Sequence, residues 1–165
     1  MAPLIVLIGT FTILGLVGRG RWPWHVSLRI ALAAMFVLTG SAHFAFLRDD
    51  MIRMVPPIFP RPDLMVTLTG IAELAGALGL LIPRTAPWAA GCLVVLMLAM
   101  FPANVHAALS GIPFDGQPPT PLLFRTLEEI VFLAAGIAAA IPDRVSAVLR
   151  GQTRSLTGVA ASRDR

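Results

Sequence analysis

Apolar residues gather in five long segments, separated by short stretches rich in arginine, proline and glycine. These segments are residues 1–18, 24–46, 64–82, 86–109 and 121–141. A helix needs about 20 apolar residues to cross the hydrocarbon core of a membrane, and each segment approaches that length. The pattern therefore predicts an all-α membrane protein with five membrane-spanning helices, whose two ends lie on opposite sides of the bilayer.

The two ends of the chain differ in character. Residues 1–18 are apolar enough to be mistaken for a signal peptide, but they lack a basic first region and a small-x-small cleavage motif. We interpret them as a retained transmembrane anchor. Residues 142–165 are polar and rich in arginine, which predicts a tail that is largely disordered.

Composition excludes a water-soluble domain, because 56% of the residues are hydrophobic, only 13% are charged and the mean hydropathy is +0.80. The net charge of +4 does not indicate a nucleic-acid partner, since the basic residues lie between and after apolar segments and not in a patch with aromatics. They are all arginines, and the excess falls on one side of the predicted membrane: Arg19, Arg21, Arg84, Arg144, Arg150 and Arg154. The positive-inside rule then places the N-terminus outside and the C-terminal tail in the cytoplasm.

Metal and dithiol chemistry find no support in the sequence. Cys92 is the only cysteine, which excludes a disulfide within the chain and a zinc site built from several thiolates. Histidine and acidic residues do not occur at HxxxH, ExxH or HExxH spacing, and no haem or iron–sulfur pattern is present. The chain therefore encodes no electron carrier, and we predict no metal site.

Glu73 is a carboxylic acid in the middle of an apolar segment. A charge near the centre of a bilayer costs about 2.5 to 3.5 kcal/mol, so this side chain needs a partner, water or a proton. Small residues four apart, Ala72 with Gly76 and Ala75 with Gly79, would let a neighbouring helix approach it. Glu73 is then either a ligand or proton site, or a group that only holds helices together.

Other polar residues are predicted at similar depth. At 1.5 Å per residue, Glu73 lies about 15 Å from the outer surface, Glu129 about 12 Å, Asn104 about 9 Å and His43 about 6 Å. Arg125, one turn before Glu129, would serve as its counter-ion or clamp an anion. We predict that His43, Glu73, Asn104, Arg125 and Glu129 form one ligand-binding pocket in the outer half of the membrane. Helix-to-helix hydrogen bonds and self-pairing of Arg125 with Glu129 are the structural alternatives.

Several motifs occur in an order and spacing that resemble the DoxX-like family of small bacterial membrane proteins, over roughly residues 26–140. They are TGSAHF (39–44), MVPP (54–57), GIAELAGALGLLIP (70–83), FPAN (101–104) and an arginine near the start of the last helix. The chain departs from the family's Arg-x-Pro-x-Gln motif, with Leu127 and Glu129 in place of proline and glutamine. The resemblance implies an antiparallel four-helix bundle at 24–141 in the bacterial inner membrane, with residues 1–18 as an additional helix and 142–165 as the tail.

The resemblance also implies a role beside redox proteins, because members resemble the membrane subunit of a thiosulfate:quinone oxidoreductase. We therefore expect an accessory subunit that binds a small amphipathic ligand such as a quinone. His43 or Glu73 would exchange protons, Asn104 would orient a carbonyl and Arg125 would balance the acids. A redox partner protein and a homo-oligomer are compatible with this role, no catalytic residue is assigned, and whether the chain is an enzyme stays open. The alternatives are a small proton-coupled transporter and a structural subunit without activity.

Overall fold

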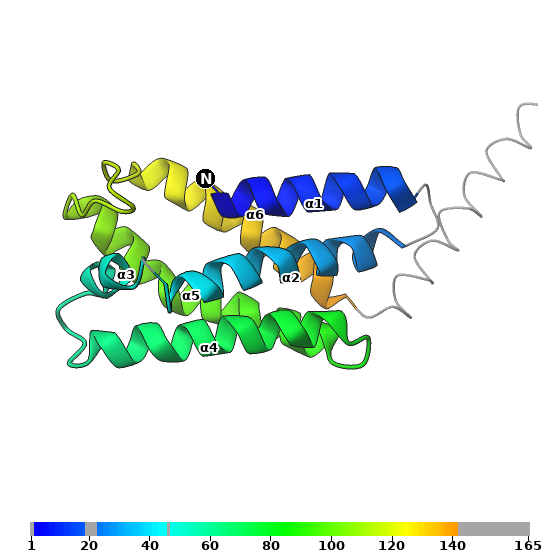
Figure 1. Cartoon of the computed structure of the whole chain (residues 1–165), viewed down its shortest axis with the longest axis horizontal. Helices are drawn as coiled ribbons and strands as arrows, with labels where there is room; N and C mark the ends of the chain where they lie inside the picture. Colours follow the sequence, from blue (N-terminus) through cyan, green and yellow to red (C-terminus); the bar gives the residue numbers. More distant parts are fainter. Residues whose placement is uncertain (1, 19–22, 46, 142–165) are drawn as a thin grey trace, which may run out of the picture.

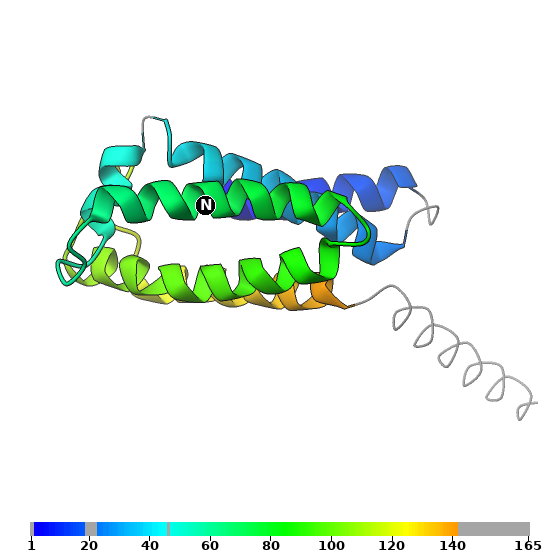
Figure 2. The ribbon, with the colours of Figure 1, turned by 90° about the horizontal axis from the view of Figure 1, so that it is seen from below.

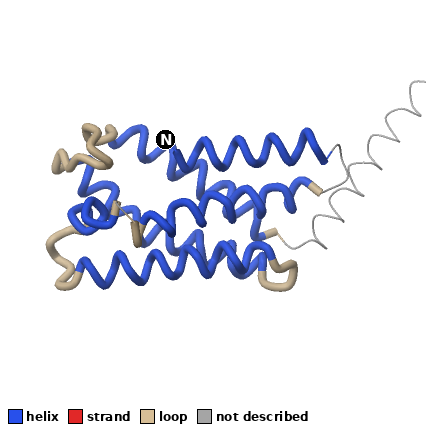
Figure 3. Tube along the Cα trace, viewed as in Figure 1, coloured by secondary structure: helices blue, strands red, loops and turns tan. Residues whose placement is uncertain are grey.

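The computed structural model describes residues 2–18, 23–45 and 47–141, and this part of the chain is all α-helical apart from its loops (Figure 3). Its six helices are α1 (Ala2–Gly18), α2 (Trp24–Ala42), α3 (Arg48–Met54), α4 (Pro62–Leu81), α5 (Ala86–Leu109) and α6 (Leu122–Ala140). The predicted tail, residues 142–165, lies outside the described residues.

Three helices, α2, α4 and α5, are long and apolar enough to cross a membrane, and α1 is a shorter apolar helix. Helix α6 carries Arg125, Glu128 and Glu129 in its first two turns. Proline occupies the first turn of both α4 and α5, where it has no amide hydrogen to leave unbonded. The predicted segments therefore match observed helices to within a few residues, except after Ala42.

The predicted segment 24–46 does not continue as one helix. Helix α2 ends at Ala42, and two turn hydrogen bonds follow, from the amide of Phe44 to Ser41 and from that of Ala45 to Ala42. Charged residues then form the separate seven-residue helix α3, with two acids in its first turn and Arg53 in its last. Acids at the start and a base at the end of a helix interact favourably with its dipole. A charged segment this short lacks the periodic apolar residues by which a helix is predicted from sequence.

The five longer helices lie side by side along the long axis of the molecule, and α3 lies at one end (Figure 1). Helix α2 packs mainly on α4, α5 on α6, and α1 on α2. A view from below shows α4 running alongside α5, to which it is joined by a short loop (Figure 2). Helix α1 begins partway along the molecule, so its first residues lie beside the middle of the other helices (Figure 1).

Small residues bring α4 and α5 close together. A Cβ atom at Gly76 would lie 2.5 Å from Leu93, and one at Gly79 would lie 2.8 Å from the Cβ of Ala89. The Cβ of Ala89 is fixed by its backbone, so only glycine fits at position 79, whereas a side chain at position 76 would require Leu93 to move. This is the close approach that the small-residue spacing predicts.

Arg29 ties the start of α2 to the end of α6. Its Nε donates to the carbonyl of Ala139 and its Nη2 to that of Ile141, each at 3.0 Å. The last carbonyls of a helix have no partner within the helix, and Arg29, only 4% exposed, satisfies two of them at the end of the molecule far from α3.

Candidate functional site

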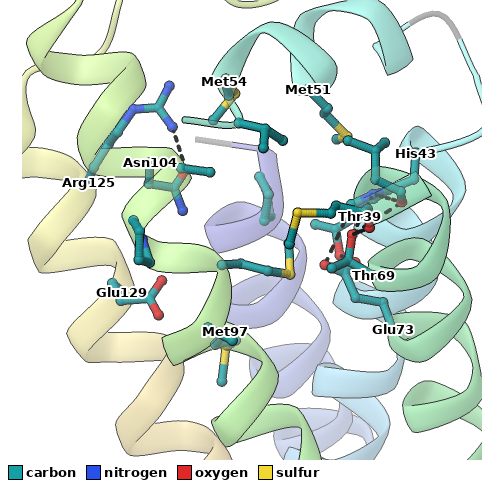
Figure 4. Close-up of a pocket in the computed structure, with 18 of the residues that line it drawn as sticks. Thr39, His43, Met51, Met54, Thr69, Glu73, Met97, Asn104, Arg125 and Glu129 are labelled. Carbon is teal, nitrogen blue, oxygen red and sulfur yellow. Dashed lines mark hydrogen bonds and ion pairs between the residues drawn. The ribbon is translucent and has the colours of Figure 1, made fainter. Parts of the chain in front are cut away.

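A cavity of about 330 Å³ lies among α2, α4, α5 and α6, at the end of the molecule where α3 lies. All five residues predicted from the sequence line it: His43, Glu73, Asn104, Arg125 and Glu129. The close-up in Figure 4 shows them on two facing walls, with His43 and Glu73 on one and Asn104, Arg125 and Glu129 on the other. The structure thus brings the predicted residues to one cavity, and their role in binding stays a prediction.

Glu73 is the most enclosed acid of the cavity, only 4% exposed. One carboxylate oxygen, Oε2, accepts a hydrogen bond from the Thr39 hydroxyl at 2.5 Å, and the other, Oε1, lies 3.6 Å from Nε2 of His43. These contacts join α4 to α2 and to His43, the residue that follows α2 (Figure 4). They are the partners that a carboxylate at this depth requires.

The hydrogen bonds of His43 fix which ring nitrogen carries a proton. Nδ1 lies 2.8 Å from the carbonyl oxygen of Val66, and because a carbonyl only accepts, Nδ1 must donate. Nε2 faces the Glu73 carboxyl group. Without a proton on either group, the lone pair of Nε2 would point toward the carboxylate. The pair is favourable when it holds one such proton, on either residue, and it is then neutral as a unit.

Asn104 and Arg125 form the polar part of the facing wall. Nη1 of Arg125 donates to Oδ1 of Asn104 at 2.8 Å, so the amide group of Asn104 is held by α6. The expected pairing of Arg125 with Glu129 is not formed, since no ion pair joins these two residues within the described part of the chain. The acid whose charge acts on Arg125 is Glu128.

Among the residues that the structure describes, Nε of Arg125, a donor, and Oε1 of Glu129, an acceptor, are buried on this wall without a hydrogen-bond partner. Buried polar atoms are nearly always hydrogen-bonded, so these two atoms lack the partners that such atoms normally have. No three His, Cys, Asp or Glu side chains of the described residues come together as a metal site would need.

The rest of the lining is unusually rich in methionine. Of the seven methionines in the chain, six line this cavity: Met35, Met51, Met54, Met65, Met97 and Met100. Sequence reasoning missed them because an apolar position in one helix gives no sign of the cavity it faces, and it also missed Thr39 and Thr69, which line the same cavity. Only their common location in space reveals them. Methionine is flexible and polarisable, so this lining can adapt to the shape of a bound molecule.

Helix α3 covers the cavity with Met51 and Met54 and is fastened to the longer helices (Figure 4). Nη1 of Arg48 donates to the carbonyl of His43 at 3.1 Å, and Nη2 to the Thr67 hydroxyl at 2.9 Å. At the other end of α3, Nδ1 of His106 lies 3.0 Å from the carbonyl of Met54. His106 is thus used to hold α3 in place.

Asp50 joins α3 to the loop between α5 and α6. Its Oδ2 accepts a hydrogen bond from the amide of Asp115 at 2.7 Å, and Oδ1 forms an ion pair with Arg53. Asp115 has a left-handed backbone, with φ of 53°, in a tight turn closed by bonds between Phe114 and Gln117. The loop and α3 therefore close this end of the molecule together.

The profile of a family described as a domain of unknown function, DUF8561, matches residues 32–127. The match covers more than half of the chain. This protein belongs to the DUF8561 family. The DUF8561 region contains four of the five cavity residues predicted from the sequence, ends just before Glu129 and leaves out α1. No curated protein and no solved structure matches the chain at a significant level.

Proposed function

We propose that this DUF8561 protein is an integral membrane protein in which α2, α4, α5 and α6 form an antiparallel four-helix transmembrane bundle and α1 is an additional transmembrane helix. Its outward faces support the proposal, because large apolar side chains point away from the packed helices. Leu78, Val95 and Ile137 are 65%, 66% and 60% exposed. A surface of this kind suits lipid and not water.

The proposed location is the bacterial inner membrane, with the N-terminus outside and the C-terminus in the cytoplasm. The excess of arginine near one side of the predicted spans supports this orientation. It places α3, the loop of residues 55–61 and the loop of residues 110–121 at the outer surface. The cavity then opens within the outer half of the membrane.

A relation to the DoxX-like proteins is part of the proposal. Its support is that the motifs behind the resemblance supply the lining of the cavity. TGSAHF contributes Thr39 and His43, GIAELAGALGLLIP contributes Glu73, and FPAN contributes Pro102 and Asn104. The shared residues are therefore those that a common site would preserve, and they lie inside the DUF8561 region.

The proposed activity is the binding of a small amphipathic molecule, with a quinone head group as the candidate ligand, by an accessory redox subunit. One observation carries it: two facing polar walls enclose an apolar, adaptable space. Arg125 would donate a hydrogen bond to one quinone oxygen. The proton held between His43 and Glu73 would be passed toward the ligand as it is reduced. Reduction to the quinol takes two electrons and two protons: a redox partner protein would supply the electrons, the His43 and Glu73 pair would supply one proton, and water at the outer surface would supply the other.

Thermal unfolding with decylubiquinone tests this function. The purified full chain in detergent should unfold at a higher temperature as the quinone is added, because a ligand that binds only the folded state stabilises it. Glu73→Gln and Asn104→Ala should each reduce that shift. Asp49→Asn removes an exposed acid that does not line the cavity and should leave it unchanged. A folded Glu73→Gln variant with the full shift contradicts the proposal.

A further inference from the structure

The acids and bases that line the cavity do not balance. Its carboxylates are those of Glu73, Glu128 and Glu129, and its basic side chains are His43 and Arg125. Glu73 faces His43 at 3.6 Å, and the charge of Glu128 acts on Arg125. Glu129 has no ion pair within the described residues, and its Oε1 is buried without a hydrogen bond. Even with His43 protonated, the cavity carries one negative charge in excess.

This excess negative charge lies in a cavity whose lining is mostly apolar. A carboxylate in such surroundings is favourable only if a positive charge or a proton accompanies it. The other wall supplies neither, since the proton held between His43 and Glu73 already serves Glu73. Glu129 must therefore hold a proton of its own or meet a cation that enters the cavity.

The rest of the lining indicates which cation would fit. Four phenylalanines face the cavity beside the six methionines: Phe36, Phe59, Phe114 and Phe132. Aromatic faces attract organic ammonium groups, and thioethers are polarisable. A hard metal ion would need six or more oxygen ligands, and the described residues form no such group. A volume of about 330 Å³ has room for one ring with an alkylammonium group.

We propose that the cavity binds an amphipathic organic cation, with its ammonium group beside Glu129 and its apolar body among the methionines and phenylalanines. The cation replaces the proton that Glu129 holds when the cavity is empty. This inference rests on the proposed function only in that both require the cavity to admit a small amphipathic molecule. The cation and a neutral quinone then compete for the same space.

Phenyltrimethylammonium and its neutral isostere tert-butylbenzene provide the test, because they differ in charge and hardly in shape. Each is titrated calorimetrically into the full chain in detergent, with the titration into detergent alone subtracted. The cation should bind at least about tenfold more tightly than the isostere, a difference of about 1.4 kcal/mol. Its affinity should increase with pH, because protons compete for the same carboxylate, and binding should release a proton.

Glu129→Gln keeps the size of the side chain and removes its charge. It should lower the affinity for the cation by about tenfold and abolish its pH dependence, while the isostere binds as before. Asp49→Asn, the same change at an exposed acid outside the cavity, should alter neither. If Glu129→Gln does not fold, Glu129→Asp serves instead, with weaker binding of the cation and the pH dependence retained.

The outcomes separate this inference from the proposed function. Equal binding of cation and isostere, or undiminished cation binding by folded Glu129→Gln, overturns the inference and leaves a decylubiquinone response as support for the proposed function. Binding of the cation without any response to decylubiquinone supports the inference and rejects the quinone. A folded protein that binds neither the cation nor decylubiquinone overturns both the inference and the proposed function.

Discussion

His43 lies close to Glu73 because Gly70, about one turn before Glu73 on α4, has no side chain to hold His43 away. A Cβ atom at position 70 would lie 2.6 Å from the Cβ of His43 and 2.9 Å from a ring atom of Phe44. The Cβ of His43 is fixed by the backbone, so it cannot swing away as the end of a long side chain would. Helix α4 thus supplies the acid of the pair and also the gap into which its partner fits.

Gly70→Ala should separate this pair. The added methyl group pushes His43 away from Glu73, and overpacking at such a contact typically costs about 1 to 3 kcal/mol. We expect a lower unfolding temperature in detergent and a smaller shift with decylubiquinone.

The matched control is Gly91→Ala, because a Cβ atom there meets nothing within 4 Å. In a helix, alanine is preferred to glycine, so this variant should be as stable as the wild type or slightly more stable. Equal unfolding temperatures for the two variants would show that the Gly70 contact does not matter.

The sequence identifies the polar residues of the cavity because ionisable groups stand out in apolar segments. It does not identify their partners. Asn104 bonds to Arg125, and Thr39 bonds to Glu73, although nothing in the spacing of these residues relates one to the other. Such pairs depend on how the helices are rotated about their axes, and that rotation is set by packing.

Among the helices, α3 depends most on contacts with the rest of the protein. Its seven residues are far fewer than the ~12 to 15 that an isolated helix needs in water. Arg48, Asp50 and His106 provide the bonds that hold it over the cavity. The helical structure of α3 therefore depends on the hydrogen bonds of these few side chains.

Asp50→Ala should loosen this end of the molecule. The change removes the acceptor for the amide of Asp115 and the partner of Arg53. Hydrogen exchange followed by mass spectrometry should then show faster exchange in α3 and in the loop of residues 110–117, with α2 and α4 unchanged.

Asp49→Ala is the control for this experiment, because Asp49 is an exposed neighbour on the same helix. It should leave the exchange of the loop unaltered. Equal acceleration by both substitutions would mean that the charge of α3, and not the bond to Asp115, sets its order.

The long helices and the short one differ in how far the sequence predicts them. Apolar length and proline at helix starts mark α1, α2, α4, α5 and α6 to within a few residues. Helix α3 has the composition of any charged helix end, so its separate existence follows only from contacts with residues distant in the sequence.

At the scale of the whole molecule, the two ends are built differently. One end holds the cavity, α3 and the longer loops, whereas the other is closed by the short connection between α4 and α5 and by Arg29 bound to the end of α6. The cavity therefore lies nearer one end of the molecule, beneath α3, and not midway between the two ends.

Cysteine labelling in intact cells tests the proposed orientation. In a Cys92→Ser background, Ser110→Cys should react with a maleimide that cannot cross the membrane, because position 110 is exposed and the proposed orientation places it outside. Arg84→Cys, exposed at the opposite end, should react only after the membrane is permeabilised. The reverse pattern would invert the orientation, and immediate reaction of both would argue against a spanning arrangement.

Pro3 of α1 also lines the cavity, although the DUF8561 region begins only at residue 32. Part of the cavity wall therefore comes from α1, which the family domain does not include. Exchanging α1 for another helix would change the shape of the cavity, while every acid and amide that lines it stayed in place. The shape of the cavity therefore depends in part on α1, whereas its acids and its amide all come from other helices.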